Sequence, residues 1–138
     1  MALTEQELAL VQGSFQKVMR MVVKVTQLFY ARLFEIDPST KPLFAHVNMP
    51  NQGLILMKTL STAVSSLDNM AILVPLLEDL GKQHITYGVI ESQYASVGEA
   101  LLWTLEQGLG DEFTPEVKAA WAKAYSILAE VACRAYRK

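Results

Sequence analysis

His84 is one of two histidines in the chain, and it follows Leu77 and Leu80 at spacings of seven and four residues. These spacings place all three side chains on one face of a helix. An imidazole on an apolar face is either a core residue that bonds to nearby carbonyl groups or a ligand for something bound in the interior. The rest of the sequence has to decide between these two possibilities.

The chain lacks the sequence motifs of the common enzyme active sites. It has no glycine-rich phosphate loop, no His-Glu-x-x-His pair and no nucleophile elbow, since Ser96-Val97-Gly98 lies within an expected helix. The single cysteine, Cys133, excludes an intrachain disulfide and a thiolate metal cluster, and we expect a small core or surface thiol there. A metal would have to arrive in a cofactor that supplies most of its own ligands. Haem is such a cofactor, because it needs one axial side chain from the protein.

Composition and charge narrow the class of protein. The 138 residues are 51% hydrophobic and 19% charged, which suits one globular domain over residues 1–138. A formal net charge of -2 gives no broad basic field, so we expect no nucleic acid partner. Glu5 and Glu7 replace the cationic start of a secretory signal, and the longest apolar run, residues 70–77, is far shorter than the ~20 residues that span a bilayer. The sequence thus predicts a soluble, cytoplasmic protein with no membrane partner.

Capping and proline signals divide the chain into helices. Thr4 and Glu7 have the form of a capping box, and Gly88 suits the left-handed conformation that closes a helix. No segment alternates apolar and polar residues as a half-buried strand does. The sequence predicts an all-α chain of about six or seven helices. The first begins near residue 4, and the others cover about 22–34, 38–44, 50–66, 69–88, 91–109 and 115–137. The apolar stripe of the helix at 50–66 is expected to consist of Leu56, Leu60, Ala63, Val64 and Leu67.

The order and spacing of several residues resemble the globin family. The similar positions are Phe29-Tyr30, Pro42-Leu43-Phe44, Gln52, Leu56, Asp79-Leu80-Gly81-Lys82-Gln83-His84, Tyr94, Val97-Gly98 and Ala120-Trp121-Ala122-Lys123-Ala124-Tyr125. Phe44 follows Tyr30 by 14 residues. His84 follows Gln52 by 32 residues and precedes Tyr94 by ten, and all three spacings agree with the family.

Within that family the pattern is most similar to the single-domain bacterial haemoglobins related to the globin half of flavohaemoglobins. Additional similarity to neuroglobin lies between Gly81 and Tyr125. The resemblance covers nearly the whole chain. It implies a globin fold, a three-over-three helical sandwich, with a short or absent helix between Phe44 and Gln52.

The resemblance implies haem b (iron protoporphyrin IX) as the cofactor, held between the helices that carry Gln52 and His84. His84 would be the proximal iron ligand through Nε2. Its other ring nitrogen would donate to a backbone carbonyl group one helical turn earlier, such as that of Leu80, and this would fix the tautomer.

Other residues would contact the cofactor if the resemblance holds. Phe44 would stack on the porphyrin, and Leu56 would limit the volume of the ligand pocket. Either could instead be an ordinary core residue. The remaining contacts would come from Leu80, Tyr94 and Val97.

The resemblance assigns Tyr30 and Gln52 as hydrogen-bond donors to a diatomic ligand. Donors in a pocket of low dielectric stabilise the negative charge that dioxygen acquires on binding. Tyr30 could instead be a packing residue with its hydroxyl at the surface. Asn51 or His46 could instead occupy the position that the resemblance assigns to Gln52, although His46 is otherwise expected in an exposed loop.

One position departs from the pattern of the flavohaemoglobins. In those proteins a tyrosine and a glutamate near the proximal histidine are thought to strengthen its electron donation. Tyr94 matches the tyrosine, but an ungapped alignment places Tyr136 at the glutamate, and Glu130 lies off that helical face. We therefore expect oxygen binding more than efficient peroxidase-like chemistry.

The resemblance implies reversible binding of dioxygen, nitric oxide or carbon monoxide. Nitric-oxide dioxygenation is a plausible activity if a separate reductase returns electrons. Two alternatives stay open at this point. One is a haem-based ligand sensor or electron-transfer globin that acts through a partner, and the other is a haem-free helical interaction domain.

Overall fold

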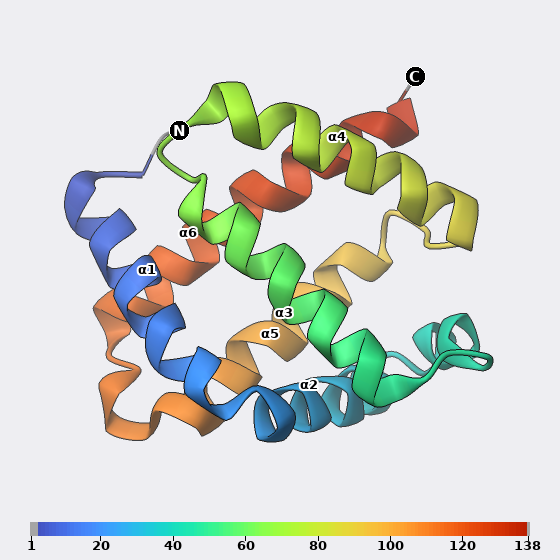
Figure 1. Ribbon diagram of the computed structural model, residues 1–138, viewed down its shortest axis with the longest axis horizontal. Coiled ribbons are helices and arrows are strands. Elements are labelled where there is room, and N and C mark those ends of the chain that lie inside the picture. Colours follow the sequence, from blue (N-terminus) through green and yellow to red (C-terminus); the bar gives the residue numbers. More distant parts are fainter. Residues whose placement is uncertain (1–2, 138) are drawn as a thin grey trace.

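The computed structural model describes residues 3–137 as a chain of helices. Its α-helices are α1 (Glu5–Val18), α2 (Val22–Ile36), α3 (Met49–Ser65), α4 (Met70–Tyr87), α5 (Gln93–Leu109) and α6 (Pro115–Cys133) (Figure 1). Short 3-10 helices join or extend them, namely η1 (Met19–Met21), η2 (Pro38–Phe44), η3 (Gly110–Glu112) and η4 (Arg134–Arg137). No strand occurs between residues 3 and 137, and only a turn separates η2 from α3. The predicted all-α class and the short connection after Phe44 are confirmed.

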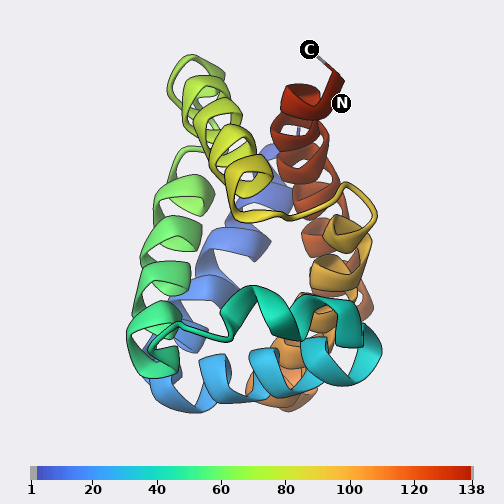
Figure 2. The same ribbon diagram turned by 90° about the vertical axis from the view of Figure 1, so that its right-hand side faces the viewer.

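The six α-helices pack in two layers of three. α1, α3 and α4 form one layer and α2, α5 and α6 form the other (Figure 1, Figure 2). The predicted three-over-three sandwich is confirmed. Large side chains less than 2% exposed fill its interior, among them Trp121, Leu33, Leu73 and Leu105. In the described part of the chain, no helix is long and apolar enough to cross a membrane.

The ends of the helices follow from short-range capping. Thr4 Oγ1 accepts a hydrogen bond from the N–H of Glu7, and the Glu7 carboxylate accepts one from the N–H of Thr4. The side chains of Asn48 and Thr114 cap α3 and α6 by accepting from a backbone N–H three residues further on. α4 ends at Gly88, whose φ of 93° lies in the left-handed region that glycine adopts without strain. The predicted start near residue 4 and the predicted end at Gly88 are thus confirmed, whereas the last α-helix ends at Cys133 and continues to Arg137 only as the 3-10 helix η4.

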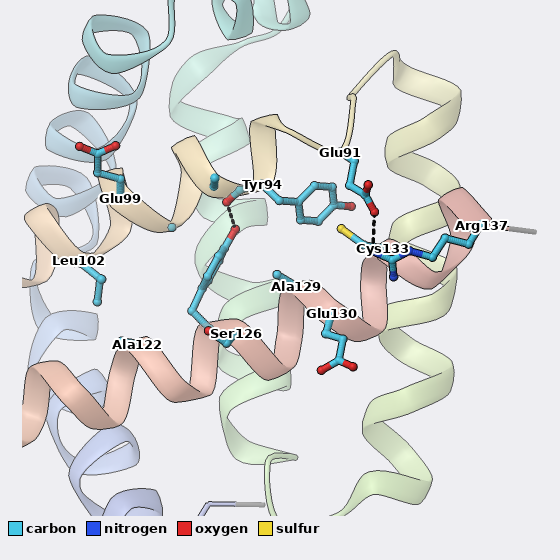
Figure 3. Close-up of a pocket in the computed structure, with 13 residues that line it drawn as sticks. Glu91, Tyr94, Glu99, Leu102, Ala122, Ser126, Ala129, Glu130, Cys133 and Arg137 are labelled. Atoms are coloured by element: carbon cyan, nitrogen blue, oxygen red, sulfur yellow. Dashed lines mark hydrogen bonds and ion pairs between the residues drawn. The ribbon is translucent and has the colours of Figure 1, made fainter. Parts of the chain in front are cut away.

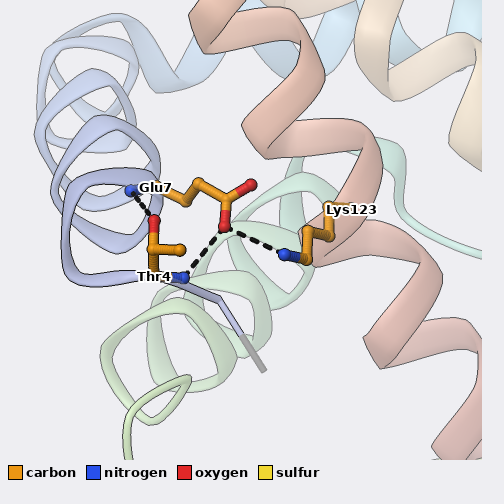
Figure 4. Close-up of polar contacts among 3 residues, drawn as sticks. All are labelled: Thr4, Glu7 and Lys123. Atoms are coloured by element: carbon orange, nitrogen blue, oxygen red, sulfur yellow. Dashed lines mark hydrogen bonds and ion pairs between the residues drawn. The ribbon is translucent and has the colours of Figure 1, made fainter. Parts of the chain in front are cut away.

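Replacing Thr4 with alanine should lower the free energy of unfolding by about 1 kcal/mol, because the N–H of Glu7 loses its acceptor. The Glu7 carboxylate also binds Lys123 on α6 at 3.0 Å, so the cap lies at the contact between α1 and α6 (Figure 4). Chemical denaturation measures the loss. Ser92 provides the control, because it precedes α5 without a capping hydrogen bond, and Ser92→Ala should change stability by less than about 0.5 kcal/mol. Equal losses in both variants would contradict the role given to the Thr4 cap.

The buried face of α3 differs from the predicted stripe in its N-terminal half. Leu56 and Leu60 are only half-buried, whereas Gly53 and Met57 lie in the core. The cause is the crossing of α3 over α2. A Cβ built on Gly53 would lie 2.8 Å from Thr26 Oγ1, so the two helices come closer than any other residue would allow. This half of α3 therefore presents Gly53 to α2 and leaves Leu56 at the edge of the core.

Candidate functional site

Four aromatic rings gather where α2 meets η2. The ring centroid of Tyr30 lies 5.2 Å from that of Phe44 and 5.1 Å from that of Phe29, both in edge-to-face arrangements. The centroids of Phe34 and Phe44 are 5.6 Å apart. Such pairs contribute stability beyond the apolar area that they bury. Tyr30 and Phe44, which the sequence analysis selected separately, are therefore in direct contact.

The hydroxyl group of Tyr30 lies near Gln52. Tyr30 is 7% exposed, so its side chain belongs to the interior. Burial raises the pKa of Tyr30 to about 12, and the neighbouring Gln52 side chain opposes part of that shift. The hydroxyl is protonated at neutral pH and can act as a donor. The structure thus brings together the two residues selected as donors to a ligand.

The crossing of α2 and α3 explains how Gln52 reaches Tyr30. The glycine after Gln52 packs on Thr26, which lies one helical turn before Tyr30 on α2. Gln52 is half-buried as a result. The alternatives, Asn51 and His46, are both exposed.

A polar network that the sequence analysis did not anticipate anchors η2, the segment that ends in Phe44. The Asp37 carboxylate accepts hydrogen bonds from Ser39 and, at 2.7 Å, from Ser96 on α5. The bonds from Ser39 and Ser96 hold the pKa of Asp37 below its usual value. Gln93, at the start of α5, donates from Nε2 to Ser39 Oγ at 3.1 Å. The network fixes η2 on α5, and this sets where Phe44 lies.

His84 is half-buried on α4, and its Nδ1 lies 2.8 Å from Tyr94 Oη. The prediction that this nitrogen donates to a backbone carbonyl such as that of Leu80 is wrong. That carbonyl already accepts the helical hydrogen bond four residues on, and Tyr94 reaches the ring from α5. Burial lowers the pKa of His84, which favours the neutral imidazole. Among residues 3–137 no hydrogen bond engages its Nε2.

The ring of Tyr136, from η4, lies behind Tyr94. The two rings meet edge-to-face with centroids 5.8 Å apart. Burial raises the pKa of Tyr94, and the neighbouring Tyr136 side chain raises it further. The Tyr136 hydroxyl donates to the Val89 carbonyl at 2.7 Å. Glu130 is exposed and takes no part in these bonds.

The residues on α2 and α3 and those on α4 and α5 lie at the same end of the molecule. A Cβ built on Gly88, at the end of α4, would lie 3.7 Å from Leu43 Cδ2, beside Phe44. Figure 2 shows η2, the end of α4 and the start of α5 around this end. The other residues selected as cofactor contacts, which are half-buried at the edge of the core, are Leu56, Leu80 and Val97.

A groove of about 550 Å³ runs between α5 and α6 and has Tyr94 in its wall (Figure 3). Figure 3 shows the Tyr94 ring directed toward Cys133, with the ion pair between Glu91 and Arg137 nearby. Cys133 is buried, and burial raises the pKa of its thiol, which disfavours the reactive thiolate. His84 does not line this groove, which shares only Tyr94 with the site described above.

The chain is similar to known proteins in sequence and in structure. A family model described as Globin matches residues 27–132. Neuroglobin-2 and neuroglobin-1 of Oncorhynchus mykiss are 32% and 33% identical to it, each over 99% of this chain and 94% of the relative. A flavohemoprotein of Rhizobium meliloti is 35% identical over 78% of this chain and 27% of its own length. A crystal structure of a hexacoordinated heme protein from an anhydrobiotic tardigrade has a TM-score of 0.86 at 22% identity, covering 99% of this chain and 96% of that one.

Proposed function

Because the chain belongs to the globin family, we propose that it is a haem protein that binds dioxygen and other diatomic ligands reversibly. The cofactor is haem b, and His84 is its axial ligand through Nε2. The observation that carries this proposal is the state of His84. Burial lowers its pKa and so favours the neutral imidazole, and its Nδ1 is engaged by Tyr94 whereas its Nε2 has no hydrogen-bond partner among residues 3–137. The tardigrade structure of the same fold is described as a heme protein, which also supports the choice of cofactor.

The residues present fit a cofactor that brings most of its own ligands. Residues 3–137 contain no group of three His, Cys, Asp or Glu side chains that could hold a metal ion. Iron would therefore need a porphyrin, with a single axial side chain from the protein. His84 supplies that ligand, Phe44 an aromatic face, and Leu56 and Leu80 apolar contacts.

Haem would supply an iron atom at which a diatomic gas binds reversibly. The protein would hold and stabilise that ligand. Tyr30 is a buried, protonated donor, and Gln52 beside it is a second one. Fixed donors in a poorly solvated pocket stabilise charge on dioxygen more than water does. We therefore expect slow release of oxygen and high affinity.

Nitric-oxide dioxygenation is a further activity that we propose for this site. Dioxygen and nitric oxide would give nitrate, and a separate reductase would have to return one electron. The partner of His84 Nδ1 is the Tyr94 hydroxyl, and the side chain that packs behind Tyr94 is Tyr136 and not a carboxylate. Reversible ligand binding is therefore better supported than peroxidase-like chemistry. Within the family, we infer a place among the single-domain haemoglobins related to flavohaemoglobins.

Replacing Gln52 with leucine should speed oxygen dissociation roughly threefold, because a half-buried donor is lost. Stopped-flow displacement of oxygen measures the rate. Asn51→Leu is the matched control, since Asn51 is adjacent but exposed and its rate should stay that of the native protein. An effect from Asn51→Leu and none from Gln52→Leu would mean that Asn51, and not Gln52, is the residue of α3 that reaches the ligand.

Reconstitution of the purified protein with haem tests the proposed function as a whole. Optical and resonance Raman spectra of the ferric, ferrous and oxygen-exposed forms should show a Soret band, an iron–histidine stretch and a reversible change with oxygen. Absence of Soret absorption after reconstitution would establish a haem-free interaction domain instead. Haem that accepts and passes on electrons but binds no oxygen would favour an electron-transfer protein.

A further inference from the structure

The groove between α5 and α6 is elongated along the two helices that form its walls. Ala122 and Cys133 are the first and last residues of α6 that line it, and they lie eleven residues apart, a rise of roughly 16 Å or three helical turns. At one end the groove is bordered by Glu91 and Arg137, whose side chains form an ion pair at 2.9 Å (Figure 3). Its length therefore matches that of a short helix.

The floor of the groove is apolar and held in shape by contacts between α5 and α6. A Cβ built on Gly98 would lie 2.6 Å from Tyr125 Cε2, so the Tyr125 ring packs directly against α5. The Tyr125 hydroxyl donates to the Tyr94 carbonyl at 2.6 Å, so neither group is left unpaired when water is excluded. Small side chains, those of Ala95, Ala122 and Ala129, line the space between the rings and the rims. An apolar partner would meet a surface that needs little rearrangement.

Carboxylates border the groove on both sides. Glu99 lies on α5 and Glu130 on α6, and Figure 3 shows them on opposite sides of the groove. Both are exposed, and neither forms an ion pair among residues 3–137. Arg32 and Lys118 border a second hollow with Glu99 but do not pair with it. The groove therefore combines an apolar floor with an excess of negative charge at its rims.

We propose that this groove binds an amphipathic helix of a partner protein, one whose apolar stripe is flanked by lysine or arginine residues. Small side chains in the floor allow a third helix to approach to the ~8–10 Å between axes that is usual for packed helices. Basic residues on the two flanks of its stripe would then meet Glu99 on one side and Glu130 on the other, as charged flanking positions do in coiled coils. The inference goes beyond the proposed function and does not depend on haem.

A second copy of this chain fits the groove less well than a basic helix does. Two copies that met through this face about a twofold axis would bring Glu99 and Glu130 of both copies into one interface. Like charges at an interface oppose association, and Arg137 is already paired with Glu91. The same carboxylates disfavour nucleic acids and acidic partners.

Two synthetic peptides test the proposal on the full chain. Each has about 15 residues, roughly 22 Å as a helix, with leucines at helical spacing, and one carries lysines on both flanks where the other carries glutamates. Fluorescence anisotropy of the dye-labelled peptides measures binding. We expect one basic peptide per chain, with an affinity that falls as salt rises, and binding of the acidic peptide at least about tenfold weaker. Equal binding of the two peptides would overturn the proposal.

Charge variants show whether the peptide recognises these two carboxylates or the net charge of the protein. Glu99→Gln combined with Glu130→Gln should weaken binding of the basic peptide roughly five- to tenfold, because two exposed ion pairs are lost. Asp68→Asn combined with Asp79→Asn is the matched control, since both residues are exposed and neither lines the groove. It should leave the affinity unchanged. Equal losses in the two double variants would overturn the proposal.

A bulky substitution tests whether the peptide lies in the groove. Ser126 is exposed and lines it, so Ser126→Trp should block the floor, abolish binding of the basic peptide and leave the fold intact by circular dichroism. Gln107→Trp, at an exposed residue of α5 that does not line the groove, should bind as the native chain does. Native affinity in Ser126→Trp would mean that the peptide binds elsewhere. Sedimentation velocity tests the other occupant, since a dimer that Ser126→Trp dissociates would make the groove a contact between copies and overturn the proposal.

Discussion

Replacing His84 with alanine should leave a folded protein that does not retain haem. The residues that hydrogen-bond to a metal ligand commonly account for roughly 10–100-fold in metal affinity, so loss of the ligand itself should reduce haem affinity by more than about a hundredfold. Helix α4 should survive, because alanine is a strong helix former and His84 is only half-buried. Soret absorbance after haem titration and the rate of haem transfer to an acceptor protein measure the effect.

The other histidine supplies the matched control for that experiment. His46 is exposed in the turn after η2, so His46→Ala should bind haem as the native protein does. Free imidazole added to the His84→Ala variant should restore part of the Soret band, which an unfolded chain would not allow. If His84→Ala bound haem with native affinity, His84 would not be the axial ligand. If only His46→Ala lost haem, His46 would be the axial ligand.

The ends of the helices could be predicted from the sequence because each depends on residues within one turn. Thr4 and Glu7 cap each other, and Gly88 closes α4 through its own backbone conformation. The rotation of α3 could not be predicted in this way. It is set by the contact of Gly53 with Thr26, two residues on different helices, and periodicity within one helix does not show which face meets a neighbour.

The sequence selected residues that the structure brings together, but it did not show which side chains contact one another. Tyr30 and Gln52 were selected by resemblance to a family, and their proximity depends on how α3 crosses α2. The predicted partner of His84 Nδ1, a backbone carbonyl one helical turn earlier that the resemblance implied, was wrong for the same reason. The Tyr94 side chain enters from α5, and the Tyr136 ring that packs on it comes from η4, beyond α6. Long-range packing decides such bonds, and short-range patterns do not record it.

Replacing Tyr30 with phenylalanine should accelerate oxygen dissociation by about tenfold, the factor that corresponds to losing one hydrogen bond of ~1.4 kcal/mol. The ring contacts with Phe29 and Phe44 remain in this variant, so only the hydroxyl is lost. With its pKa raised to about 12, that hydroxyl is a donor at neutral pH. Stopped-flow measurement of oxygen release provides the rate. Tyr87→Phe, at a residue 70% exposed, should leave the rate unchanged.

Carbon monoxide and a second mutation sharpen the test of Tyr30. Carbon monoxide gains less negative charge on binding than dioxygen does, so its dissociation should change much less in Tyr30→Phe. Since the side chains of Tyr30 and Gln52 lie close enough to influence each other, Tyr30→Phe combined with Gln52→Leu should accelerate oxygen release by less than the product of the two single effects. A rise in oxygen release that carbon monoxide matched would indicate a change in pocket volume. An unchanged rate of oxygen dissociation would mean that the Tyr30 hydroxyl makes no hydrogen bond to the ligand.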